Sequence, residues 1–166
     1  RNQGPTELQY CDFDNFILAD ALRGNSRLVN LRVLCRSSPN EVGNREFLAI
    51  MSALRQNKGL VNLAIWLDLS MSDESWGAVC DLLKTLTHPT LQVLDLETMK
   101  SIGVDPALLN SRMPVLVQAL VDMLKVNMSI RTIPWSSFCP YPSSELFQGS
   151  VDPYLETNKF RPRLLA

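Results

Sequence analysis

The chain has 166 residues, of which 46% are hydrophobic, and its 16 Lys and Arg nearly balance 17 Asp and Glu, for a formal net charge of −1. The apolar content is too high for a disordered segment and sufficient for one domain with a buried core. The near-neutral charge argues against a chain-wide nucleic-acid-binding surface. The sequence lacks a run of about 18 uninterrupted apolar residues, so we expect no membrane span.

A repeated pattern of leucine and asparagine runs through the chain. Four copies share Leu-x-x-Asn followed three residues later by Leu, Ile or, in the last copy, Arg; they begin at Leu22, Leu54, Leu124 and Leu155. A fifth copy begins at Leu86, with Pro89 in the asparagine position and one residue deleted before Leu91. Recurrence of one pattern at this spacing is typical of a solenoid, in which stacked units share a core.

Each of the first four copies in chain order is preceded by an amphipathic stretch with the i, i+3, i+4 spacing of a helix. Polar or proline residues mark the expected helix starts, which are Asp14, Asn44, Ser72 and Pro114, the last as a first-turn proline. A separate short helix is expected at 106–110, and a further short one from Asp152. Residues 136–149, which are rich in Pro and Ser, are expected to form a loop.

After each of these copies, apolar and polar residues alternate, which predicts a strand with one buried face. The expected strands lie at 31–36, 63–69, 94–97 and 133–136, where Pro134 indicates a weak or edge strand. Residues 7–11 are interpreted as a remnant strand, with Leu8 and Tyr10 pointing inward. Since a helix separates successive strands, we expect the strands to pair in parallel.

The segments 16–33, 47–65 and 90–96 resemble the ribonuclease-inhibitor-like subfamily of leucine-rich-repeat proteins, in which a helix ends in leucine, turns at Asn and leads into a Leu-x-x-Leu-x-Leu strand. The resemblance implies an α/β leucine-rich-repeat solenoid, a right-handed horseshoe arc with parallel strands on the concave side and helices on the convex side. We expect a repeat array at 1–135 and an irregular closing unit with a C-terminal cap at 136–166. The chain is interpreted as the C-terminal part of a longer array.

Members of that subfamily mostly bind macromolecules through concave residues, which implies a non-catalytic protein-interaction module here. The candidate partner-binding residues are Arg32, Leu34, Arg36, Asn62, Trp66, Asp68, Asp95 and Glu97. An exposed Trp66 flanked by charges would suit a binding anchor. The alternative is a structural C-terminal capping segment of a larger multidomain protein, with no partner of its own.

Catalytic, cofactor and metal sites are not expected. The single His88 lies in a turn, and Asp95 and Glu97 would lie about 7 Å apart on one strand face without an environment that shifts their pKa values. Four scattered cysteines suit reduced thiols in a cytoplasmic protein, and the glycan acceptor pattern that begins at Asn127 carries little weight. We expect a protein partner, no nucleic acid, and a monomer or part of a longer chain.

Overall fold

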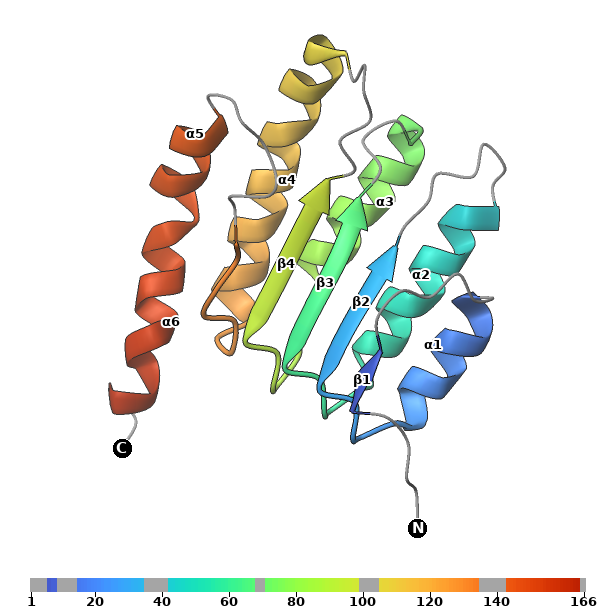
Figure 1. Cartoon of the computed structure of the whole chain (residues 1–166). Coiled ribbons are helices and arrows are strands. Elements are labelled where there is room, and N and C mark those ends of the chain that lie inside the picture. The colour runs from blue at the N-terminus through green and yellow to red at the C-terminus, as the bar shows by residue number, and fades with distance from the viewer. Residues whose placement is uncertain are drawn as a thin grey trace.

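The computed structural model describes residues 6–8, 15–34, 42–67, 71–98, 105–134 and 143–164. In these ranges helices and strands alternate before two helices close the chain (Figure 1). The elements are β1 Glu7–Leu8, α1 Asn15–Gly24, β2 Asn30–Leu34, α2 Val42–Leu54, β3 Asn62–Leu67, α3 Asp73–Lys84, β4 Val93–Thr98, α4 Pro106–Val126, α5 Ser143–Ser150 and α6 Asp152–Leu164.

The strands form one parallel sheet in the order β1-β2-β3-β4, and helices α1 to α4 lie behind one face of it (Figure 1). Equivalent residues of successive units are in register, so that Leu31 lies beside Leu63 and Leu63 beside Leu94. The predicted side-by-side parallel strands are therefore confirmed. In the part of the fourth unit that the structure describes, the sheet is continued by an isolated bridge from Thr132 to Val93, in agreement with the weak strand predicted around Pro134. The four strands make a short sheet, so the curvature of a full horseshoe stays a prediction.

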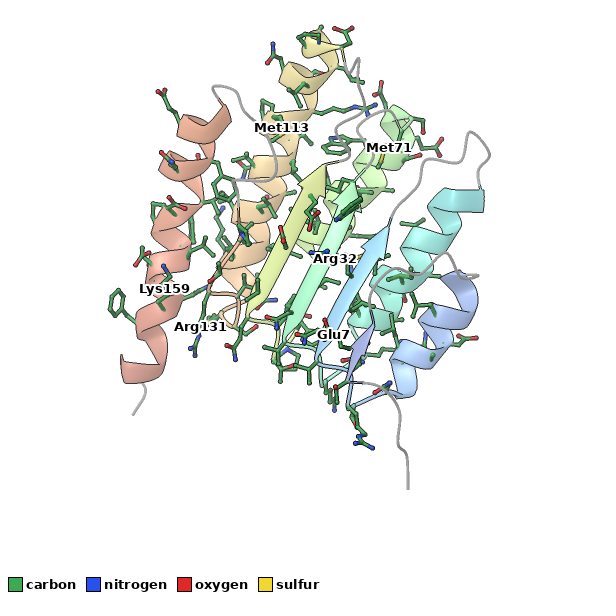
Figure 2. All side chains as sticks on the ribbon, in the orientation of Figure 1. Glu7, Arg32, Met71, Met113, Arg131 and Lys159 are labelled. Carbon is green, nitrogen blue, oxygen red and sulfur yellow. The ribbon has the colours of Figure 1, made fainter. Side chains whose placement is uncertain are left out.

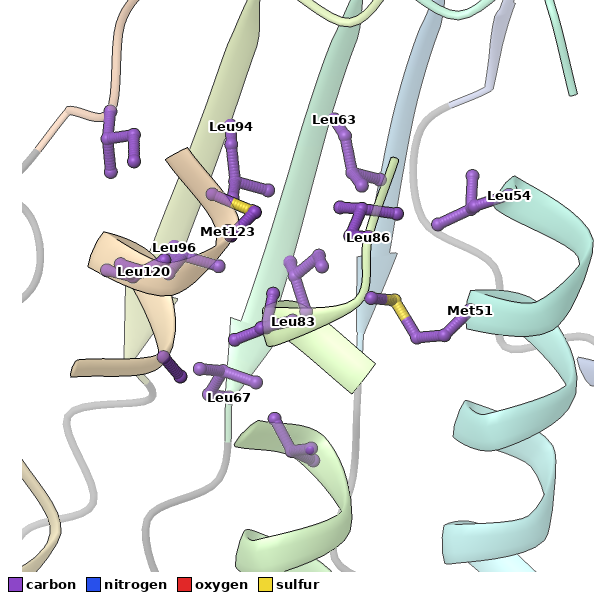
Figure 3. Close-up of a cluster of buried hydrophobic side chains, with 14 of the residues drawn as sticks. Met51, Leu54, Leu63, Leu67, Leu83, Leu86, Leu94, Leu96, Leu120 and Met123 are labelled. Atoms are coloured by element: carbon purple, nitrogen blue, oxygen red, sulfur yellow. The ribbon is translucent and has the colours of Figure 1, made fainter. Parts of the chain in front are cut away.

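The core lies between the sheet and the helices (Figure 3). The inward side chains of the strands, such as Leu63, Leu94 and Leu96, meet helix side chains such as Met51, Leu83 and Leu120, and all of these are at most 1% exposed. A single unit has one apolar face and cannot bury it alone, whereas stacked units bury a continuous core. The leucine spacing of the sequence is thus the spacing of core layers.

A buried polar ladder crosses the turns where the helices lead into the strands. The Nδ2 atom of Asn57 donates to the carbonyl oxygens of Leu22 and Asn25 in the preceding unit, while its Oδ1 accepts from the backbone N–H groups of Gly59 and Leu60. Asn57 is 1% exposed. The repeated Asn is therefore a connector between units as well as a turn residue.

The third unit places His88, not Pro89, in the asparagine position of this ladder. The Nδ1 atom of His88 accepts from the backbone N–H of Leu91 at 3.1 Å, as Asn57 Oδ1 does from Leu60. The assignment of Pro89 to this position was wrong. The residue that this copy lacks relative to the others is missing before the asparagine position, between Leu86 and His88, and not after it. The Nδ1 atom of an imidazole can accept a hydrogen bond as the oxygen of a carboxamide does. A search for a repeated asparagine does not find a histidine that takes its place.

Asn127 and Asn158 continue the ladder. Asn127 donates to the carbonyl of Leu86 at 3.4 Å, and Asn158 donates to the carbonyls of Asn127 and Ile130 at 3.2 and 2.9 Å. Asn127 is 3% exposed, so the acceptor pattern that begins there does not present an accessible amide for a glycan. Asn158 lies inside α6, because the chain continues there as a helix and does not turn into a strand.

Helix α4 differs from expectation because it is one continuous helix of 21 residues, with Pro114 in its interior. The helix begins at the Asp105 cap, whose side chain accepts from the backbone N–H of Ala107, and Pro106 occupies the first turn. Pro114 removes the N–H that would bond to the carbonyl of Asn110. Both residues lie on the exposed side of the helix, where water can satisfy that carbonyl. The expected separate helix at 106–110 is the first part of α4.

A buried arginine anchors this long helix. Arg112, which is 5% exposed, donates to the carbonyl of Met71 and to the Asp73 carboxylate, both at 2.7 Å, and its guanidinium lies 5.5 Å from the ring centroid of Trp76. These contacts tie α4 to the start of α3. Among the described helices, α4 is also the one long and apolar enough to cross a membrane by length and composition, and its burial in the core accounts for that composition.

The C-terminal region also departs from expectation. Residues 143–150, predicted as part of a loop, form α5, and the helix from Asp152 extends to Leu164. Phe147, Val151 and Leu155 are buried against the array. The two helices thus cover the end of the core that the fourth unit leaves incomplete.

Candidate partner-binding face

The face of the sheet opposite the helices carries the candidate residues. Because side chains alternate along a strand, the residues between the buried leucines point away from the core. In-register pairing arranges them in three rows across β2, β3 and β4: Asn30, Asn62 and Val93; Arg32, Ala64 and Asp95; Leu34, Trp66 and Glu97. The structure therefore places Arg32, Asn62, Trp66, Asp95 and Glu97 on one surface. The backbone of Leu34 is in register with Trp66, while Arg36 and Asp68 lie outside the described residues.

A hollow of about 240 Å³ lies in this surface. The middle row explains it, since the small Ala64 is between two longer charged side chains, Arg32 and Asp95. The lining residues are Glu7, Asn30, Leu31, Arg32, Asn62, Leu63, Ala64, Val93 and Asp95. Asn62 donates through Nδ2 to Oδ1 of Asn30, which joins two of the lining strands by side chains as well as by backbone.

Charged groups on this face are linked across the sheet. The guanidinium of Arg32 lies 3.1 Å from the Glu97 carboxylate, and it therefore reaches past β3 from β2 to β4. Burial raises the pKa of Asp95, and the positive charge of Arg32 partly opposes that rise. The Oδ1 atom of Asp95 has no hydrogen-bond partner among the described residues. A carboxylate in this position gains from any donor that a partner brings into the hollow.

Trp66 lies in the row beside the hollow and is partly buried. The sequence predicted an exposed Trp66, whereas the side chain is only partly exposed because neighbouring side chains cover part of the indole. A partly buried ring is held in place before any partner arrives, which lowers the entropy cost of using it in binding.

The titratable side chains that the sequence offered as catalytic candidates are paired or buried. The Glu97 carboxylate is paired with Arg32, and the pKa rise of Asp95 comes chiefly from its burial. His88 and Cys80 are buried on the helix side of the sheet, where burial raises the pKa of the Cys80 thiol to about 11 and lowers that of His88. Within the described ranges, no group of three or more His, Cys, Asp or Glu is arranged to hold a metal ion.

No family model matches the sequence, and no curated protein matches it significantly. Among solved structures, the chain is similar to Leiomodin-1 actin-binding site 2, with a TM-score of 0.58 and 14% identity over 96% of this chain and 86% of that chain. It also matches the tropomodulin C-terminal domain of Caenorhabditis elegans, with a TM-score of 0.43 and 17% identity over 92% and 97% of the respective chains.

The fold is leucine-rich-repeat-like. This conclusion rests on the register of the repeated leucines, the turn ladder and the first of these two resemblances. The leucine-rich-repeat-like sheet places five of the eight predicted residues on one face, and the backbone of a sixth, Leu34, is in register with them. The leucine periodicity was sufficient to find that face. The hollow was missed because it depends on which residues from three different strands lie side by side.

Proposed function

We propose that the chain is a non-catalytic protein-interaction module that binds a protein partner through the open face of its sheet. The observation that carries the proposal is the combination, on that face, of a hollow, a partly buried tryptophan and a carboxylate oxygen, Asp95 Oδ1, that has no hydrogen-bond partner among the described residues. Interfaces of this kind concentrate binding energy in a few aromatic and charged residues.

Actin is the candidate partner. The support for it is the structural likeness to a domain described as an actin-binding site, at 14% identity. An actin-binding role would place the protein in the cytoplasm, in agreement with the reduced cysteines expected from the sequence. The binding residues proposed are Arg32, Leu34, Arg36, Asn62, Trp66, Asp68, Asp95 and Glu97, two of which lie outside the described ranges.

Co-sedimentation with filamentous actin and a binding titration with monomeric actin test this proposal. Truncation of Trp66 to Ala should weaken binding by about 30-fold, because a hot-spot aromatic contributes about 2 kcal/mol. Arg32→Glu should also weaken it, since the new carboxylate faces Asp95 and Glu97. Arg27→Glu, in the exposed turn before β2, is the matched charge control and should bind as the wild type does.

Equal binding by Trp66→Ala, Arg32→Glu and the control would remove the sheet face from the proposal. Absence of actin binding by the wild type in both assays would remove actin. Circular dichroism melts of each variant separate loss of binding from loss of the fold.

The alternative is a structural role for the C-terminal region in closing a larger array. Phe147 of α5, Val151 between the two helices and Leu155 of α6 are buried against the array, which favours this role for residues 143–164. The division at residue 135 into an array and a closing unit remains part of this proposal. Deletion of residues 143–166 should expose the apolar surface of the array that these three side chains cover, and should cause aggregation. A soluble, cooperatively melting deletion variant would contradict the closing role.

A further inference from the structure

The hollow in the open face of the sheet is bounded by all four strands. Leu31 and Leu63 are 2% and 1% exposed, so their side chains lie in the core and they line the hollow with backbone. Figure 2 shows Glu7 and Arg32 on the side of the sheet away from the helices, where they bound the hollow on β1 and β2. Asp95 bounds it on β4. Charged side chains therefore lie on opposite sides of a floor of strand backbone.

Carboxylates outnumber cations around the hollow. Its lining contains two carboxylates, Glu7 and Asp95, and one cation, Arg32. The guanidinium of Arg32 lies 3.1 Å from the carboxylate of Glu97, so the charge of Glu97 offsets that of Arg32. The charges of Glu7 and Asp95 then remain as a negative excess. Such a surface attracts a cationic group of a partner and repels an anionic one.

Asp95 supplies an oxygen atom for such a group. Its Oδ1 atom has no hydrogen-bond partner among the described residues, and Arg32, which is paired with Glu97, acts on Asp95 as a nearby charge. The last torsion of an aspartate side chain is broad, so the carboxylate can turn Oδ1 towards a donor that enters the hollow. A cationic donor suits this oxygen best, because charge-assisted hydrogen bonds are roughly twice as strong as neutral ones.

The size and lining of the hollow fit one long side chain. Its volume of about 240 Å³ is below the roughly 300–1,000 Å³ of pockets that hold small molecules. Ala64 and Val93 provide apolar surface beside the carboxylate of Asp95. Lysine and arginine match this combination, because each has an aliphatic stem that packs on apolar surface and a cationic head.

We propose that the hollow receives a lysine or arginine side chain of the partner protein, with its cationic head on Asp95 and its stem over Ala64 and Val93. This inference rests on the proposed function, because it names the group that the open face of the sheet binds. Trp66 lies in the row beside the hollow. The tryptophan and the hollow would therefore act on neighbouring residues of the partner.

An NMR titration of the full chain at pH 7 tests the hollow without any partner protein. The probes are acetylated and amidated tripeptides: Gly-Lys-Gly, Gly-Arg-Gly and, as a neutral control, Gly-norleucine-Gly. The two basic tripeptides should shift the backbone amide signals of Ala64 and Asp95, and the norleucine tripeptide should leave them unchanged. Asp95→Asn should weaken binding of the basic tripeptides tenfold or more, because it removes the charge and keeps the shape.

Two further variants complete the titration. Ala64→Leu fills the hollow and should abolish binding of the basic tripeptides. Glu74→Gln removes an exposed carboxylate on α3, away from the hollow, and is the matched control that should bind as the wild type does. Circular dichroism melts of each variant verify the fold. If Ala64→Leu does not fold, Asp95→Asn and its Glu74→Gln control carry the test.

No shift with either basic tripeptide, equal binding of the norleucine tripeptide, or unchanged binding by Asp95→Asn would each overturn the inference. Its failure is distinguishable from that of the proposed function. Actin binding that is weakened by Trp66→Ala and unaffected by Asp95→Asn and Ala64→Leu would leave the sheet face in use and overturn the role of the hollow. A wild type that binds the basic tripeptides and not actin would support the hollow and remove actin as the partner.

Discussion

Replacement of Asn57 by Ala tests the ladder that joins the units. The side chain takes part in four hydrogen bonds: it donates to Leu22 and Asn25 and accepts from Gly59 and Leu60. Each net bond contributes about 1 kcal/mol, and buried partners left without water cost at least as much. We therefore expect the free energy of unfolding to fall by about 4 kcal/mol, a large fraction of the 5–15 kcal/mol that is usual for a domain.

The matched control is Asn25→Ala. The Oδ1 atom of Asn25 accepts from the backbone N–H groups of Arg27 and Leu28 within its own turn, and within the described ranges its side chain makes no hydrogen bond to another unit. Its loss should cost about 2 kcal/mol by the same reckoning. Urea unfolding followed by circular dichroism measures both variants. Equal costs for the two substitutions would show that the bonds between units contribute nothing, and would refute the reasoning.

The remaining predictions concern three single sites. Burial keeps the pKa of His88 below its ordinary value, so the free energy of unfolding should have its full value above about pH 6.5 and should fall by up to about 1.4 kcal/mol per pH unit as the pH drops toward the folded-state pKa. His88→Asn should flatten this pH profile between pH 7 and 5, and parallel profiles for the variant and the wild type would contradict the prediction. A Cβ on Gly59 would lie 2.3 Å from the carbonyl oxygen of Ser26, so Gly59→Ala should cost about 1–3 kcal/mol in urea unfolding, whereas Gly77→Ala, with open space around it, should not destabilise. Because burial raises the pKa of Asp95, the contribution of this carboxyl to stability falls as the pH rises through that pKa. Asp95→Asn should therefore stabilise the fold at pH 7 by a few tenths of a kcal/mol, seen as a higher thermal midpoint. A lower midpoint would show that burial is not the cause of the raised pKa.

The repeat could be predicted because burial imposes a period. Leu31, Leu63 and Leu94 occupy one layer of the core, and the strand alternation around them follows from the pleat. The same alternation placed Arg32, Asn62 and Asp95 on the open face without any knowledge of contacts. Ser72 was a correct helix cap because its hydroxyl accepts from the backbone N–H of Ser75, a local contact.

Features that depend on contacts between residues far apart in the sequence could not be predicted. His88 serves as an asparagine only because its Nδ1 faces two backbone donors, and α4 continues past Pro114 because the missing hydrogen bond falls on the solvent side. The role of Arg112 could not be predicted from the sequence, since it depends on contacts with Met71 and Asp73, about 40 residues away. The Pro and Ser before α5 favoured a loop, while the burial of Phe147 stabilises a helix there.

Hydroxyl-radical footprinting of the chain with and without actin tests the proposed use of the sheet face most directly, because oxidation reports on side chains and Trp, Met and Phe react readily. Trp66 should be protected in the complex, while Val115 on the helix side keeps its reactivity. Protection confined to the helix side, with the oxidation of Trp66 unchanged at saturating actin, would contradict the account.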